Sequence, residues 1–176
     1  MKAIHKKLKE NFLSNNPMTP RQVGFVKQAV ETSVAATLAL YLAGLFQLPE
    51  PYWAAVSAII IMQSDLNAAM TASVSRLAGT AIGALVGACA VSLWGTHLWS
   101  FALGIFCAIL LCAIVGRWET YRFAGVTVAI VMLITRQASP WIIAVHRFLE
   151  VSFGIGVAFL VILVTLKLFP GKKRIL

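Results

Sequence analysis

Six apolar stretches, separated by short polar or basic connections, make up most of this chain and decide what it can fold into. They cover about residues 29–48, 52–62, 77–94, 98–115, 123–135 and 148–169. A helix needs about 20 residues to cross the hydrocarbon core of a bilayer. Four of the stretches approach or exceed that length, and the second and fifth are clearly shorter. The pattern predicts an all-α, polytopic membrane protein with six transmembrane helices.

Composition excludes the usual soluble classes. The chain is 60% hydrophobic and 12% charged, whereas a soluble domain is about 45–50% apolar and about 25% charged. A soluble domain of this size could not hide so much apolar surface, which argues against a cytosolic enzyme, a nucleic-acid-binding domain and a disordered chain. The sequence has no nucleophile-and-base set and no phosphate loop, and its three cysteines lack metal-ligand spacing. We therefore predict no enzymatic activity, no cofactor, no metal and no nucleic-acid partner.

The basic residues orient the chain in the lipid bilayer. With the N-terminus in the cytoplasm and six alternating helices, 13 of the 15 basic residues fall inside, and only Arg136 and Arg147 fall outside. This bias follows the positive-inside rule and predicts that both termini are cytoplasmic. It divides the chain into a basic N-terminal segment (1–27), a transmembrane domain (28–170) and a basic tail (171–176). The N-terminal segment fits either a short helix on the inner leaflet or a solvated basic tail.

A weak internal repeat relates the two halves of the transmembrane domain. Shifted by 71 residues, residues 53–87 align with 124–158, and the identities include Arg76 with Arg147 and Gly83 with Gly154. A repeat of three helices must insert in opposite directions. The fold is therefore predicted as an inverted repeat of three plus three helices, residues 28–94 and 98–170, a plan that many secondary transporters share.

The two short apolar stretches occupy corresponding places in the two halves. Each is followed by polar chain, residues 63–67 in the first half and 135–137 in the second. Paired short or interrupted segments point to a substrate site in transporters with inverted repeats. The alternative is that both helices simply continue past the hydrocarbon as polar helices, and the two interpretations agree if the polar extensions line a cavity.

Arg76 and Arg147, at the start of the third and sixth apolar helices, are the main candidates for substrate binding. Ionisable groups at membrane depth are costly and usually face the bundle interior or water. A guanidinium grips a carboxylate through two hydrogen bonds and stays charged when partly buried, so the pair suits an anion path. Glu150, three residues after Arg147, is placed to pair with it. Each arginine alone also fits snorkelling to the headgroups or a structural ion pair.

Other candidates rest on position and spacing. Asp65, after the second stretch, could pair with a basic residue or carry a proton, and Trp53 lies closest to the suspected cavity, where it could stack on an aromatic ligand. Glycines recur every four residues in the third helix. Such a stripe lets a neighbouring helix approach closely. The helix-packing residues predicted in this way are Gly79, Gly83 and Gly87, together with Gly154 and Gly156 in the sixth helix.

The run Leu-Pro-Glu-Pro-Tyr-Trp-Ala-Ala-Val-Ser-Ala-Ile-Ile-Ile-Met-Gln at residues 48–63, followed by Arg76-x-x-Gly79-Thr80-x-x-Gly83-x-x-x-Gly87, resembles the fusaric acid resistance and aromatic acid exporter family. The resemblance implies a bacterial inner-membrane protein with six helices per unit that moves aromatic or other organic anions outward. It also implies that Arg76 and Arg147 attract the anion, that Gln63 is a polar group at the cavity, and that Gly79 and Thr80 pack the helices.

Many members of that family carry two six-helix units and a large cytosolic domain, whereas this chain has one unit. We therefore expect a homodimer or larger assembly. The leading hypothesis is a transporter or channel that exports organic anions, in particular aromatic carboxylates. The alternative is a non-transporting membrane scaffold or regulatory subunit, and energy coupling stays open between proton exchange and passive flow.

Overall fold

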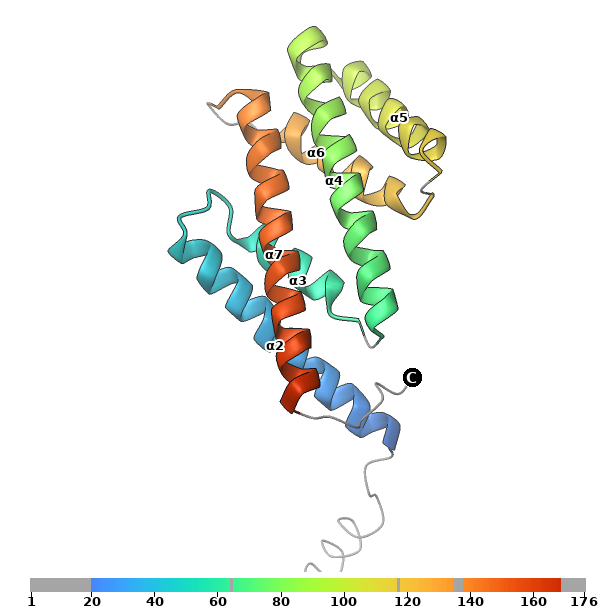
Figure 1. Cartoon of the computed structure of the whole chain (residues 1–176). Helices are drawn as coiled ribbons and strands as arrows, with labels where there is room; N and C mark the ends of the chain where they lie inside the picture. Colours follow the sequence, from blue (N-terminus) through green and yellow to red (C-terminus); the bar gives the residue numbers. More distant parts are fainter. Residues whose placement is uncertain (1–19, 64, 117, 135–137, 169–176) are drawn as a thin grey trace, which may run out of the picture.

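The computed structural model describes residues 20–63, 65–116, 118–134 and 138–168, and every regular element in these ranges is helical (Figure 1). The elements are α2 (Pro20–Leu45), α3 (Tyr52–Ile61), α4 (Leu66–Trp94), α5 (Leu98–Ile114), the 3₁₀ turn η1 (Trp118–Thr120), α6 (Tyr121–Leu133) and α7 (Pro140–Leu168). The all-α prediction is confirmed for this part of the chain. Residues 1–19 of the predicted N-terminal segment and the predicted tail 171–176 lie outside the described residues.

Three of these helices are long and apolar enough to cross a membrane, judged by length and composition. They are α2 from Gly24 onward, α4 and α7. The remaining apolar helices are α3 with 10 residues, α5 with 17 and α6 with 13. At 1.5 Å per residue, α3 and α6 reach only about 15 and 20 Å, so neither matches the thickness of the hydrocarbon core by itself.

Two helices begin earlier than the apolar runs predict. The runs place the third and sixth helices at 77–94 and 148–169, but α4 starts at Leu66 and α7 at Pro140. Arg76 and Arg147 therefore lie inside their helices and not at the start, as the sequence suggested. The early turns of α4 are polar enough to interrupt the apolar run but are still helical. Ser73 there, and Thr80 further along the helix, donate their hydroxyls to the backbone carbonyls of Ala69 and Arg76, so these side chains are satisfied within the helix.

The short helix α3 ends abruptly. Its backbone leaves the helix at Met62, and α4 starts again at Leu66 after a capping contact from Asp65, whose side chain accepts a hydrogen bond from the Ala68 N–H at 3.0 Å. The helix does not continue into the polar residues after it, so the alternative of a continuing polar helix is wrong for α3. The polar residues 135–137 after α6 lie outside the described part of the chain.

The described residues form three hydrophobic core clusters. One lies mainly between α2, α3 and α7, with contributions such as Ala39, Ala58 and Ile162. A second joins α4, α5 and α6, where Ala108 and Val128 are fully buried. A third, smaller cluster joins α4, α6 and α7. In Figure 1, α3 crosses behind α7 and α6 crosses behind α4. Relative to the predicted repeats, the first two helices of each half thus pack against the third helix of the other half.

Glycines bring the long and short helices into close contact. A Cβ atom added at Gly83 of α4 would overlap the carbonyl oxygen of Ala124 in α6, and one added at Gly154 of α7 would overlap the carbonyl oxygen of Ala54 in α3. Gly79 and Gly87 also face α6. Close backbone approach of this kind is how helices associate where lipid provides no hydrophobic drive. Gly156 is exposed, with no other atom within 4 Å of its Cβ position, so it takes no part in this contact.

The difference between Gly154 and Gly156 gives a matched test of the contact. Gly154→Ala must push α7 away from the α3 backbone, and we expect it to lower the free energy of unfolding by about 1–3 kcal/mol. Gly156→Ala meets open space in a helix interior and should be neutral or stabilising by about 0.5–1 kcal/mol. Thermal unfolding of both variants in the same detergent measures the difference, and equal midpoints would contradict the assigned contact.

Candidate functional site

Arg147 lies in a buried cluster with two carboxylates and an aromatic ring. Its guanidinium pairs with Glu50 through Nη2, and with Glu150 through Nη1 at 3.2 Å from Oε2. The guanidinium carbon lies 4.6 Å from the centre of the Trp53 ring, within the range of a cation–π contact. Arg147, Glu50 and Glu150 are 2%, 5% and 0% exposed.

Backbone and ring donors hold the carboxylates in place. The Glu50 N–H donates to Glu150 Oε1 at 2.8 Å, and the Trp53 indole N–H donates to Glu50 Oε2 at 3.1 Å. Glu50 sits in the turn before α3, whereas Arg147 and Glu150 lie one turn apart on α7. The cluster therefore connects the start of α3 to the first half of α7. The Arg147 guanidinium already forms ion pairs with two carboxylates of the chain.

Arg76 is buried without a carboxylate. Its side chain is 5% exposed, and its guanidinium carbon lies 4.9 Å from the centre of the Phe123 ring. No acidic side chain among the described residues forms an ion pair with it, and its Nε has no hydrogen-bond partner there. A buried charge is normally paired or hydrogen-bonded, so Arg76 lies in the kind of place where an anion would be stabilised.

A cavity of about 710 Å³ opens beside Arg76, between the end of α3, the first turns of α4, and the η1–α6 junction. Ser75 and Phe123, which flank or contact Arg76, are part of its wall. The other polar residues of the wall are Gln63, Thr71, Glu119, Tyr121 and Arg122. This volume is in the range of small-molecule sites.

A second, smaller cavity of about 330 Å³ lies at the opposite ends of the same helices. Val91 near the end of α4, residues 131–134 at the end of α6, and Ile143 in α7 line it. Because the first residues of α4 and α6 border the larger cavity, the two cavities lie at opposite ends of the α4–α6 pair. The glycine contacts of Gly83 and Gly87 with α6 lie between them.

The predicted substrate-binding residues do not form one site in the structure. Trp53 and Glu150 belong to the Arg147 cluster. Gln63 lines the larger cavity and donates to the Ile60 carbonyl at 2.7 Å. Asp65 is exposed and caps α4.

Two residues of these sites were missed by the sequence analysis: Glu50 and Phe123. Glu50 lies in the Leu-Pro-Glu-Pro turn, which was interpreted only as a connection between helices. Phe123 contacts Arg76 as Trp53 contacts Arg147, but it lies 70 positions after Trp53, one fewer than the shift that aligns the arginines. A comparison that allowed one extra residue between the helices would have paired the two rings. Among the described residues, no group of three potential ligands could hold a metal ion.

Substitution of the two arginines is expected to have opposite effects on the stability of the protein. Arg147→Met removes the cation between two buried carboxylates, and we expect a loss of about 3–5 kcal/mol. Arg76→Met replaces a buried guanidinium that has no counter-ion among the described residues, so the unfolding midpoint should stay equal or rise. Both are read from thermal unfolding in detergent. A further variant that joins Arg147→Met with Glu50→Gln and Glu150→Gln should recover much of the loss, and an Arg147→Met variant as stable as wild type would contradict the cluster.

The chain is similar to known proteins over most of its length. The family model of the fusaric acid resistance protein-like proteins matches residues 38–161. The "Uncharacterized transporter YdhK" of Escherichia coli (strain K12) is 30% identical over 154 residues, which cover 81% of this chain and 23% of the relative. Its namesake in Salmonella typhimurium is also 30% identical over 154 residues, 22% of its length. The chain thus spans about a quarter of these relatives, and no solved structure matches it. Because the family model covers well over half of the chain, the chain belongs to the fusaric acid resistance protein-like family of membrane transport proteins.

Proposed function

We propose that this chain moves organic anions, in particular aromatic carboxylates, outward across the bacterial inner membrane. The observation that carries the proposal is Arg76, a buried guanidinium on the Phe123 ring with no carboxylate of the described chain to balance it. Its neighbours Ser75 and Phe123 line the larger cavity. A carboxylate would supply the missing charge through two hydrogen bonds. An aromatic ring on the same ligand would match the aromatic and apolar part of the wall.

The proposed path runs along the α4–α6 pair. One cavity lies at each end of the pair, and the glycine contacts close the space between them. Movement of α6 relative to α4 would open one cavity toward the other. In this arrangement the anion meets Arg76 close to the larger cavity before it passes the glycine contact.

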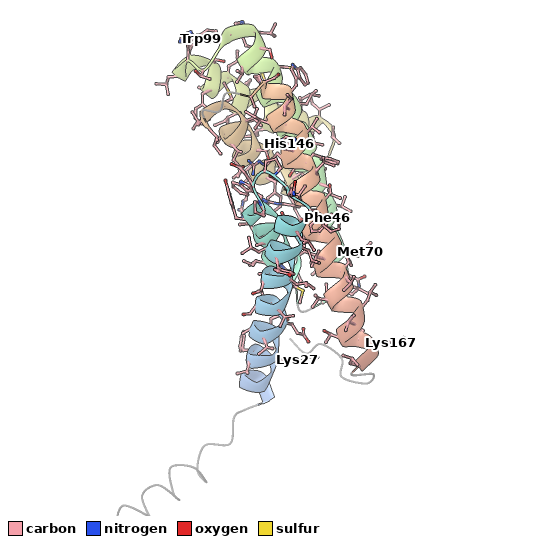
Figure 2. All side chains as sticks on the ribbon, turned by 90° about the vertical axis from the view of Figure 1, so that its left-hand side faces the viewer. Lys27, Phe46, Met70, Trp99, His146 and Lys167 are labelled. Atoms are coloured by element: carbon pink, nitrogen blue, oxygen red, sulfur yellow. The ribbon has the colours of Figure 1, made fainter. Side chains whose placement is uncertain are left out.

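We also propose a topology of six spans as an inverted repeat of three plus three, with both termini in the cytoplasm. In support, the helix order of long or intermediate, short and long recurs as α2, α3, α4 and α5, α6, α7. Lys27 near the start of α2 and Lys167 near the end of α7 lie toward one end of the molecule, and Trp99 lies at the opposite end (Figure 2). This fits basic residues inside and an interfacial tryptophan outside. The short helices α3 and α6 would then be the interrupted spans that border the substrate path.

Flux through vesicles tests the transport proposal. The protein is reconstituted alone, and uptake or release of radiolabelled benzoate is followed. We expect wild-type flux, and a loss of at least about tenfold in Arg76→Gln, because a bidentate charge contact contributes more than 1.4 kcal/mol. Arg122→Gln, an exposed change on the same cavity wall, is the matched control and should keep most of the flux.

Absence of flux for every organic anion, in protein that is folded and alone, would contradict transport. Co-purification with a fixed partner in that case would support the alternative of a scaffold or regulatory subunit.

We also propose assembly as a homodimer, in which two six-helix units lie side by side. Light scattering of the detergent-solubilised protein, corrected for bound detergent, should give twice the 19.1 kDa mass of the chain. A monomeric mass with full flux would contradict this proposal and leave the transport proposal intact.

A further inference from the structure

The two arginines lie in equivalent corners of the structure, and the corners differ in their acidic residues. Arg147 follows Arg76 by 71 positions, and the rings beneath them, Trp53 and Phe123, are 70 positions apart. By the same offsets, Glu150 corresponds to Gly79, and Glu50 corresponds to Thr120. Where one corner holds two carboxylates, the other holds a hydrogen atom and a hydroxyl.

The backbone of Thr120 lies against α4 one turn after Arg76, because α4 packs closely on η1 and α6. A Cβ added at Gly79, one turn after Arg76, would lie 2.8 Å from the Thr120 carbonyl oxygen and 2.6 Å from the Phe123 Cβ. No side chain fits at Gly79, so α4 supplies no group at the place that corresponds to Glu150. The threonine side chain at Thr120 is shorter than glutamate and carries no carboxylate, so η1 supplies no counterpart of the Glu50 charge.

The polar atoms of this corner lack partners. Thr120 is fully buried and its hydroxyl has no hydrogen-bond partner, and the same holds for Nε of Arg76. Thr120 also makes no capping contact with the start of α6. Buried donors without acceptors are rare in folded proteins. Nε and Nη1 of Arg147 also lack a hydrogen-bond partner, but Glu50 and Glu150 balance its charge. At Arg76 no carboxylate of the described residues does so. The neighbours of Arg76 and Thr120, which include Phe123, Glu119 and Tyr121, line the larger cavity, so an acceptor from outside the described chain has a route to this corner.

We propose that Thr120 is the second anion-binding residue, and that the carboxylate of the ligand takes the place around Arg76 that the Glu50 carboxylate takes around Arg147. The guanidinium binds one face of the ligand carboxylate, and the Thr120 hydroxyl donates a hydrogen bond to it. This inference rests on the proposed function, because it identifies a specificity residue for the same site. It also explains why the two arginines differ, since the chain closes one corner with its own carboxylates and leaves the other for a ligand.

Thr120→Val and Thr120→Ser separate the hydroxyl from the shape of the side chain. Valine keeps the size of threonine but cannot donate, so the affinity for labelled benzoate should fall by about tenfold or more, because a hydrogen bond to a charged group is lost. Serine keeps the donor and should bind benzoate within about threefold of wild type. Binding is measured at equilibrium on detergent-solubilised protein, and the thermal unfolding midpoints of both variants should match wild type.

Thr120→Glu tests whether the corner accepts a carboxylate of the chain. Glutamate there should fill the Arg76 corner as Glu50 fills the Arg147 corner, so benzoate binding is lost and the unfolding midpoint rises above that of Thr120→Gln. If Thr120 had only a structural role, a buried glutamate would instead lower the midpoint.

The outcomes distinguish this inference from the proposed function. Wild-type benzoate affinity in Thr120→Val would overturn the role of Thr120, as would a Thr120→Glu variant less stable than Thr120→Gln. In either case, loss of binding in Arg76→Gln would still support anion transport. Wild-type protein that binds no aromatic carboxylate would overturn the proposed function itself.

Discussion

Close contact between helices at two glycines is the constraint on which the rest of this structure depends. The helices α3 and α6 are too short to be held by the length of their own apolar faces, and each is fixed by the approach of a long helix to its backbone at Ala54 or Ala124. Arg147 and Arg76 each lie seven residues, two helical turns, before the glycine of their helix and so share its face. Trp53 and Phe123 directly precede the contacted alanines. The glycine contacts therefore also place an aromatic ring under each arginine.

The same backbone geometry leads to different energies at the two arginines. Burial of a guanidinium costs several kcal/mol of hydration, and a ring beneath it returns only about 0.5–2 kcal/mol. At Arg147 two carboxylates offset the remaining hydration cost of the guanidinium. A backbone N–H and an indole N–H hold these carboxylates in place. At Arg76 the described chain offers the Phe123 ring and no carboxylate. Arg76 is thus kept at a cost to stability, which is typical of residues that serve function and not folding.

The sequence predicted the helical class, the corresponding positions of Arg76 and Arg147 in the two halves, and the shortness of the α3 segment. It misplaced the starts of α4 and α7, because a run of apolar residues marks the part of a helix that faces lipid. The first turns of these two helices are partly covered by protein. Ser73 and Ser75 are buried there, and a polar side chain buried in protein lowers the hydropathy without ending the helix. The sequence also could not separate Arg76 from Arg147. That difference depends on Glu50, which is close to Arg147 only after α3 folds back on α7, 97 residues away in the chain.

Two arginines with similar rings beneath them but unequal charges beside them give the described chain one closed corner and one open corner. Two equivalent arginines would offer an anion two strong sites in series, which would hold it too firmly for release. Because Glu50 and Glu150 already pair with Arg147, an anion on the proposed path would meet one unbalanced guanidinium. Pairing with Arg76 recovers free energy that folding has already spent on burying the charge, so the ligand binds without a further desolvation cost on the protein side. In the proposed mechanism, a single site of this kind would be strong enough to select a carboxylate and would still release it once α6 moved away from α4.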